Sequence, residues 1–169
     1  TAPEFSNIFS NLGITFLRNC LTKIRFDEKI LEFSDDLNIG YECLIICTGS
    51  LSNNFSVKGV DENCYFFNNL NDLKKLKSFL QKFKNDKIKK NLFVIGAGPS
   101  GVEIACKIND IYKNKFDISI VERSNEILGR NKIFNREEAE KALERRKINV
   151  LLNSTVQEIS DQKISILDD

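Results

Sequence analysis

A glycine-rich turn constrains the fold of this chain more than any other feature of the sequence. Gly96-Ala97-Gly98-Pro99-Ser100-Gly101 follows an apolar run and opens a helical pattern that continues through Ile111. The first glycine permits a tight turn, the second lets a pyrophosphate approach the backbone, and the third lets the helix pack closely on the sheet. The free amides at the helix start favour a diphosphate, and Pro99 costs little in the first turn. The sequence therefore predicts a dinucleotide-binding βαβ unit over residues 92–122.

A carboxylate follows the next predicted strand, at the place where such a unit binds the adenine ribose. Glu122 lies 21 residues after Gly101, close to the spacing expected for an acid that accepts hydrogen bonds from the ribose hydroxyls. A carboxylate there repels the 2′-phosphate of NADP, so the pattern favours NAD(H), although the neighbouring Arg123 leaves NADP(H) open. The alternative interpretation is a glycine-rich packing turn followed by an exposed glutamate.

Periodicity and turn signals place the other elements. We expect helices at 4–12, 71–83 and 135–147, strands at 14–17, 21–26, 29–33, 41–47, 91–95, 117–121 and 149–153, and a hairpin of 156–159 with 163–167. The strand at 41–47 is expected to be buried on both faces, with Cys43 and Cys47 as buried thiols. Asn71 or Asp72 is expected to cap the second helix, and Asn135 with Glu138 to form a capping box on the third.

The order of these elements predicts an α/β fold. From residue 91 onward it is β, α, β, α, β, β, which is typical of a Rossmann-like domain with a parallel sheet, helical crossovers and a β-hairpin. We expect a β-rich segment at 1–62, a linker with an amphipathic helix at 63–87, and the dinucleotide-binding domain at 88–169.

Composition excludes several classes of function. The 25 Lys and Arg nearly balance the 24 Asp and Glu, so no net charge attracts nucleic acid. Five cysteines without a CxxC pair and the lack of histidine argue against a zinc site or a disulfide framework. Free thiols and the lack of an apolar stretch of about 20 residues favour a cytoplasmic protein. The chain contains no methionine and begins at Thr1, so we expect a piece of a larger protein.

Support for catalytic side chains is sparse. Glu103 is expected in the first turn of the helix after the glycines, where a carboxylate is stabilised by the helix dipole. Because there is no histidine, and no cysteine beside an obvious base, nucleophilic or acid–base catalysis has no support in the sequence.

Four motifs in order resemble a known family. They are Leu44-Ile45-Ile46-Cys47-Thr48-Gly49-Ser50, Gly59-Val60-Asp61, the segment 93–105 and the segment 118–122. Their order is similar to that in FAD-dependent pyridine nucleotide-disulfide oxidoreductases. The sequence Gly-Ala-Gly-Pro-Ser-Gly-Val-Glu-Ile-Ala most resembles that of the branch that contains type II NADH dehydrogenases.

The resemblance implies that hydride passes from NADH to FAD and that electrons pass on to a quinone or another acceptor. It also implies that residues 1–62 are a β-rich fragment of an FAD domain and that residues 88–169 are the NAD(H)-binding domain. By the same resemblance, Thr48 and Gly49 lie near the flavin and Glu103 near the nicotinamide. The candidate cofactor-binding residues are then Thr48, Gly49, Gly96, Gly98, Pro99, Ser100, Gly101, Glu122 and Arg123. The family's first GxGxxG, its later Gly-Asp motif and its membrane-anchoring helices are missing here. This piece alone is therefore expected to be inactive, with any peripheral membrane attachment made through segments outside it.

Other interpretations stay open at this point. The acceptor could be a disulfide or a ferredoxin, the chain could be a nucleotide-sensing or scaffold module without turnover, or the βαβ turn could bind FAD. Phe66, Phe67 and Phe79 could lie on an exposed face, which would favour a homo-oligomer.

Overall fold

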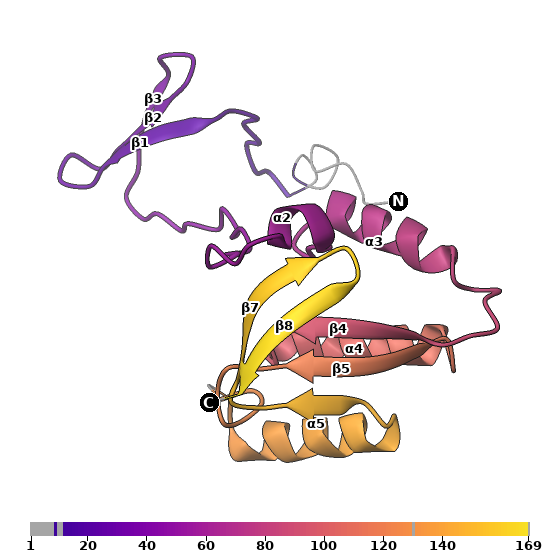
Figure 1. The fold of residues 1–169 in the computed structure, drawn as a ribbon. Helices are drawn as coiled ribbons and strands as arrows, with labels where there is room; N and C mark the ends of the chain where they lie inside the picture. Colours follow the sequence, from indigo (N-terminus) through magenta and orange to yellow (C-terminus); the bar gives the residue numbers. More distant parts are fainter. Residues whose placement is uncertain (1–8, 10–11, 130, 169) are drawn as a thin grey trace. The chain divides into compact units, whose positions relative to one another are not determined.

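The computed structural model of the protein describes residue 9 and residues 12–129 and 131–168 (Figure 1). The chain forms two compact units, Thr1–Gly49 and Ser50–Asp169, and each is described by itself. The predicted helix at 4–12 falls mainly outside the described residues. The predicted domain boundaries at residues 62 and 87 stay predictions.

The first unit contains a three-stranded antiparallel meander. Its strands are β1 (Leu21–Arg25), β2 (Ile30–Phe33) and β3 (Asn38–Gly40), in the order β1-β2-β3. Arg25 forms ion pairs with Glu28 across the first turn and with Glu32 on β2, at 2.5 and 2.8 Å. The predicted strands at 21–26 and 29–33 are confirmed.

The prediction of two other strands in this unit is wrong. Residues 14–17 and 41–47 have no strand conformation, and within the second segment Ile45 is 81% and Ile46 54% exposed. Cys43 and Cys47 are exposed as well, which corrects the prediction of buried thiols. The physical reason is that a strand needs a neighbour for its backbone hydrogen bonds, and no described strand pairs with either segment.

The second unit is built on a parallel sheet with helical crossovers. Strands β4 (Lys90–Ile95), β5 (Phe116–Val121) and β6 (Asn149–Leu151) lie in the order β4-β5-β6. Helix α4 (Pro99–Ile111) joins the first pair of strands and α5 (Ile133–Arg145) the second. The antiparallel hairpin of β7 (Ser154–Ser160) and β8 (Lys163–Asp168) follows, while α2 (Val60–Asn63) and α3 (Leu70–Gln81) precede the sheet. The predicted α/β fold is confirmed, and α2 is an element that the sequence analysis missed.

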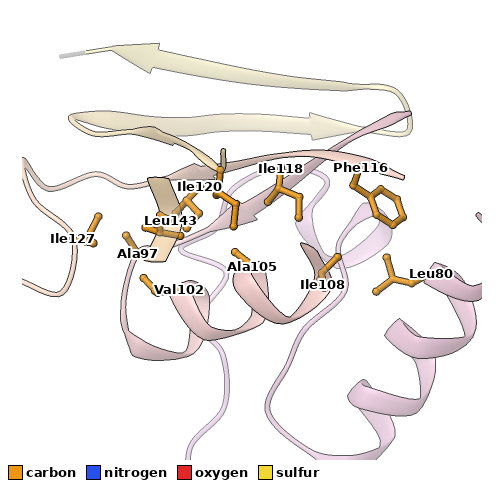
Figure 2. Close-up of a cluster of buried hydrophobic side chains, with 11 residues drawn as sticks. Leu80, Ala97, Val102, Ala105, Ile108, Phe116, Ile118, Ile120, Ile127 and Leu143 are labelled. Atoms are coloured by element: carbon orange, nitrogen blue, oxygen red, sulfur yellow. The ribbon is translucent and has the colours of Figure 1, made fainter. Parts of the chain in front are cut away.

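The core of this unit lies between the sheet and its helices. Figure 2 shows Phe116, Ile118 and Ile120 of β5 pointing toward α4, because alternate residues of a strand face the same side. From the helices come Val102, Ala105 and Ile108 of α4, Leu143 of α5 and Leu80 of α3. The β7–β8 hairpin lies on the other side of the sheet from α4. This packing fixes where β4 and β5 end, which is where the candidate site lies.

Both predicted helix caps are wrong. Asn69 caps α3, since its Oδ1 accepts hydrogen bonds from the amides of Asn71 and Asp72 at 2.9 and 3.0 Å. On α5 the residue before the helix is Lys132, which forms no side-chain cap. Each helix begins earlier than the sequence pattern indicated, so Asn71, Asp72 and Asn135 lie inside a helix and cannot cap its start.

Candidate functional site

The glycine turn between β4 and α4 uses its three glycines for different purposes. Gly96 has a φ of +100°, a left-handed backbone that favours glycine. A Cβ on Gly101 would lie 1.9 Å from the carbonyl oxygen of Gly96, so the helix can approach the strand only without a side chain there. Gly98 differs from both, because its φ is −70° and a Cβ would meet nothing within 4 Å. Neither backbone conformation nor packing within the chain therefore requires a glycine at position 98.

The N-terminus of helix α4 lies at this turn, and no side chain caps it. Pro99 is its first residue, and Gly98, the N-cap, offers no side chain to the first-turn amides. The helix dipole places partial positive charge at this end. The arrangement is therefore suited to an anionic group that approaches the backbone of Gly98.

A hollow of about 220 Å³ adjoins the turn. It joins the glycine turn to the end of β5 and to the loop that precedes α5. Its lining residues are Ala97, Gly98, Pro99, Glu122, Ser124, Glu126, Leu128, Gly129 and Asn131. A hydrogen bond connects the loop before α5 to the glycine turn: the amide of Leu128 donates to the carbonyl oxygen of Ala97 at 3.0 Å. Glu126 is held from the other side by an ion pair with Arg136 of α5 at 2.5 Å.

Glu122 is the residue that connects the parts of this hollow. Its Oε2 accepts a hydrogen bond from the amide of Ala97 at 2.7 Å, and its Oε1 accepts from the amide and the hydroxyl of Ser124 at 2.8 and 2.5 Å. Partial burial acts to raise the pKa of this carboxyl, but the hydrogen bonds from Ser124 and Ala97 and the charge of Arg123 outweigh it. The pKa therefore lies below its ordinary value, and Glu122 is a carboxylate at neutral pH.

The family assignment follows from a match that covers almost the whole chain. A family model described as pyridine nucleotide-disulphide oxidoreductase matches residues 3–169. The chain belongs to the pyridine nucleotide-disulphide oxidoreductase family. The resemblance in the four motifs of the sequence is thereby confirmed.

Curated proteins are similar to this chain over much of its length. The demethylphylloquinone reductase of Synechocystis sp. is 30% identical over 98% of this chain and 42% of its own length. A mitochondrial external alternative NAD(P)H-ubiquinone oxidoreductase of Arabidopsis thaliana, B3, is 30% identical over 77% of this chain and 26% of its own length. The chain thus spans less than half the length of these relatives.

Solved structures of other proteins share the fold of this chain. NDH2 of Plasmodium falciparum, solved in complex with NADH, is 24% identical, with a TM-score of 0.65 over 90% of this chain and 36% of that chain. A ferredoxin reductase from Rhodopseudomonas palustris is 17% identical, with a TM-score of 0.72 over 95% of this chain and 39% of that chain. At these identities the likeness establishes the fold.

The structure brings only part of the predicted family site into the hollow. Gly98, Pro99 and Glu122 line it, whereas Gly96, Ser100 and Gly101 belong to the same turn without lining it. Arg123 does not line it either. Its guanidinium lies over the ring of Phe55, 5.9 Å from the ring centre. Thr48 and Gly49 are exposed and belong to the first unit.

Glu103 lies elsewhere on α4 than the sequence analysis expected. The helix begins at Pro99, so Glu103 comes after the first turn, and its side chain is exposed and does not line the hollow. The prediction that the helix dipole stabilises Glu103 in the first turn is therefore wrong, since that effect fades beyond one turn.

Three polar residues of the hollow were missed by the sequence analysis. Ser124 could have been found, because a hydroxyl two residues after a strand-ending acid commonly forms a local hydrogen bond. Glu126 and Asn131 had no comparable signal, since only the folded loop brings them to the glycine turn.

Two other kinds of site are absent from the part of the chain that the structure describes. Within residues 12–129 and 131–168, no three His, Cys, Asp or Glu side chains gather where they could bind a metal ion. No helix in these ranges is both long enough and apolar enough to span a bilayer.

Proposed function

We propose that this chain is the NAD(H)-binding portion of a larger flavin-dependent oxidoreductase, which passes hydride from NADH to FAD and electrons on to a quinone or another acceptor. One observation carries the proposal. Gly98 faces open space at the start of α4, and that space is shared with the carboxylate of Glu122. The activity is assigned to the whole protein because the chain spans less than half of its curated relatives.

The residues of the hollow fit the two ends of an adenosine diphosphate group. The backbone of Gly98 and the N-terminus of α4 would receive the diphosphate, with Gly96 and Gly101 shaping the turn. Glu122 would accept hydrogen bonds from the ribose hydroxyls, since a carboxylate can accept more than the three bonds it already receives. Bound NADH would supply the hydride, and this chain's own residues would bind and orient it.

Charge supports NADH over NADPH. Glu122 and Glu126 both line the hollow, and a 2′-phosphate placed there would meet two carboxylates. The ion pair with Arg136 partly offsets the charge of Glu126, whereas the described hydrogen bonds of Glu122 come from the uncharged groups of Ala97 and Ser124. We therefore assign the ribose-binding role to Glu122.

The remaining site assignments extend the same proposal. Thr48 and Gly49 would lie near the flavin and Glu103 near the nicotinamide, as the family resemblance implies. A quinone is favoured as acceptor because the curated relatives are named as a demethylphylloquinone reductase and as NAD(P)H-ubiquinone oxidoreductases. The whole protein would then work at a membrane surface, where quinones reside, and attach through segments outside this chain.

A titration of the full-length protein with NADH tests the cofactor site. Gly98→Ala is expected to weaken NADH binding by about tenfold or more, because the new methyl occupies the space in front of the α4 amides. Gly40→Ala is the matched control, since a Cβ there also meets nothing within 4 Å but lies on β3. Equal NADH affinity in the wild type and Gly98→Ala would contradict the proposal.

Turnover is tested separately. The oxidoreductase proposal predicts a yellow full-length protein whose flavin is bleached by NADH and reoxidised by a soluble quinone. A colourless protein that binds NADH without oxidising it would instead support a sensor or scaffold module.

A further inference from the structure

Arg123 is the neighbour in sequence of the carboxylate proposed to bind the ribose, but its guanidinium contacts another residue. It directly follows Glu122, yet its guanidinium lies over the Phe55 ring at 5.9 Å and its side chain does not line the hollow. An arginine at this place matters because a planar guanidinium can bind a phosphate through two parallel hydrogen bonds. The position of the Arg123 guanidinium therefore affects whether the 2′-phosphate of NADPH can form an ion pair with it.

Phe55 comes from a segment far from Arg123 in the sequence, and its own loop holds it in place. The amide of Phe55 donates to Asn53 Oδ1 at 2.8 Å, and the amide of Ser56 donates to Asn54 Oδ1 at 3.0 Å. The Asn54 side chain also donates to the carboxylate of Asp61 on α2, at 3.0 and 3.2 Å. The ring position is therefore set by a hydrogen-bonded loop.

This loop is attached in turn to the β7–β8 hairpin. The amide of Ile159 donates to the carbonyl oxygen of Lys58 at 2.9 Å, and the Lys58 ammonium pairs with Glu158 at 2.7 Å. Gly59 approaches β7 so closely that a Cβ would lie 1.8 Å from the Ile159 carbonyl oxygen. Contacts within one unit thus run from β7 through α2 to the Phe55 ring.

The conformation of Phe55 is unusual for a residue with so little burial. Its φ is 49° and that of Ser56 is 58°, both in the left-handed region that disfavours residues with a side chain. Phe55 as a whole is nevertheless 70% exposed, so core packing does not explain the arrangement. Among the described residues, the charged group that contacts the Phe55 ring is the guanidinium of Arg123.

We propose that Phe55 is a specificity-determining residue, which holds Arg123 away from the ribose 2′ position and so favours NADH over NADPH. The inference rests on the proposed NADH site. Release of Arg123 would let its guanidinium turn toward the hollow, where it would attract a 2′-phosphate and offset more of the charge of Glu122 than it does over the Phe55 ring. Phe55 acts through Arg123 and is a positioning residue.

The test is the ratio of NADPH to NADH dissociation constants, measured by titration of the full-length protein. Phe55→Ala is expected to lower this ratio by about two- to fivefold, the size of an exposed cation–π contact. Phe55→Tyr keeps the ring and should leave the ratio at the wild-type value. The gain in NADPH binding should also shrink with added salt, because it depends on charge.

The double variant Phe55→Ala/Arg123→Ala separates the proposed role from a structural one. Without the guanidinium, the gain in NADPH binding should disappear. A ratio that does not change in Phe55→Ala, or that falls equally in the double variant, would overturn the inference. A wild-type protein that does not bind NADH would overturn the proposed function as well, so the two failures are distinguishable.

Discussion

The carboxylate of Glu122 accepts a hydrogen bond from the amide of Ala97 at 2.7 Å, which links the end of β5 to the glycine turn after β4. The residue expected to bind the cofactor ribose therefore also stabilises the turn that would receive the diphosphate. The proposed recognition of the ribose and the local stability of the turn would thus depend on the same side chain, and the two can be measured separately.

Replacement of Glu122 should lower stability even without a cofactor. Glu122→Ala removes an acceptor from the amide of Ala97 and from Ser124, and should lower the free energy of unfolding by about 1–3 kcal/mol. Glu122→Gln keeps one acceptor oxygen, so its free energy of unfolding should fall by about half as much as that of Glu122→Ala. Urea unfolding of both variants measures the difference, and an unchanged free energy in Glu122→Ala would contradict the structural role.

The same carboxylate predicts a dependence of stability on pH. The pKa of Glu122 lies below its ordinary value near 4.5 in the folded protein, so its contribution is complete above that value. The contribution is lost as the pH falls through the lower, folded pKa. The stability advantage of the wild type over Glu122→Gln should therefore be larger at about pH 6 than at about pH 3. Urea unfolding at the two pH values checks this, and an equal advantage at both would contradict it.

Substitution of Gly101 should disrupt the turn between β4 and α4. The Cβ of Gly101→Ala would lie 1.9 Å from the backbone oxygen of Gly96, so strand and helix must separate. We expect the free energy of unfolding to fall by about 3 kcal/mol or more. Gly98→Ala, whose Cβ meets nothing, should stay within about 1 kcal/mol of the wild type. Comparable losses in thermal or urea unfolding would refute this distinction.

The cap of α3 gives a test in which neighbouring asparagines behave differently. Asn69→Ala removes the acceptor for two helix amides and should lower the free energy of unfolding by about 1 kcal/mol. Asn71 lies inside the helix, so Asn71→Ala should change the free energy of unfolding by less than about 0.5 kcal/mol. The opposite order of effects would restore the sequence-based assignment of the cap to Asn71.

Prediction from the sequence succeeded where a pattern repeats locally and is buried in the same unit. The strands 91–95 and 117–121 and the helix that ends at Ile111 were each predicted within about two residues, because their apolar positions face one core. It failed at 41–47, where the apolar run has the composition of a buried strand but no described neighbour to pair with. Local composition reports what a segment could bury, whereas pairing depends on the rest of the chain.

The sequence by itself determined the α/β order of the second unit, the place of the glycine turn and the acid that follows β5, because each depends on residues close together in the chain. Only the tertiary structure decided that Glu126 and Asn131 share a hollow with Gly98, and that Phe55 lies beneath the guanidinium of Arg123. These contacts join segments separated by loops, and loop paths depend on hydrogen bonds and packing that no local pattern encodes.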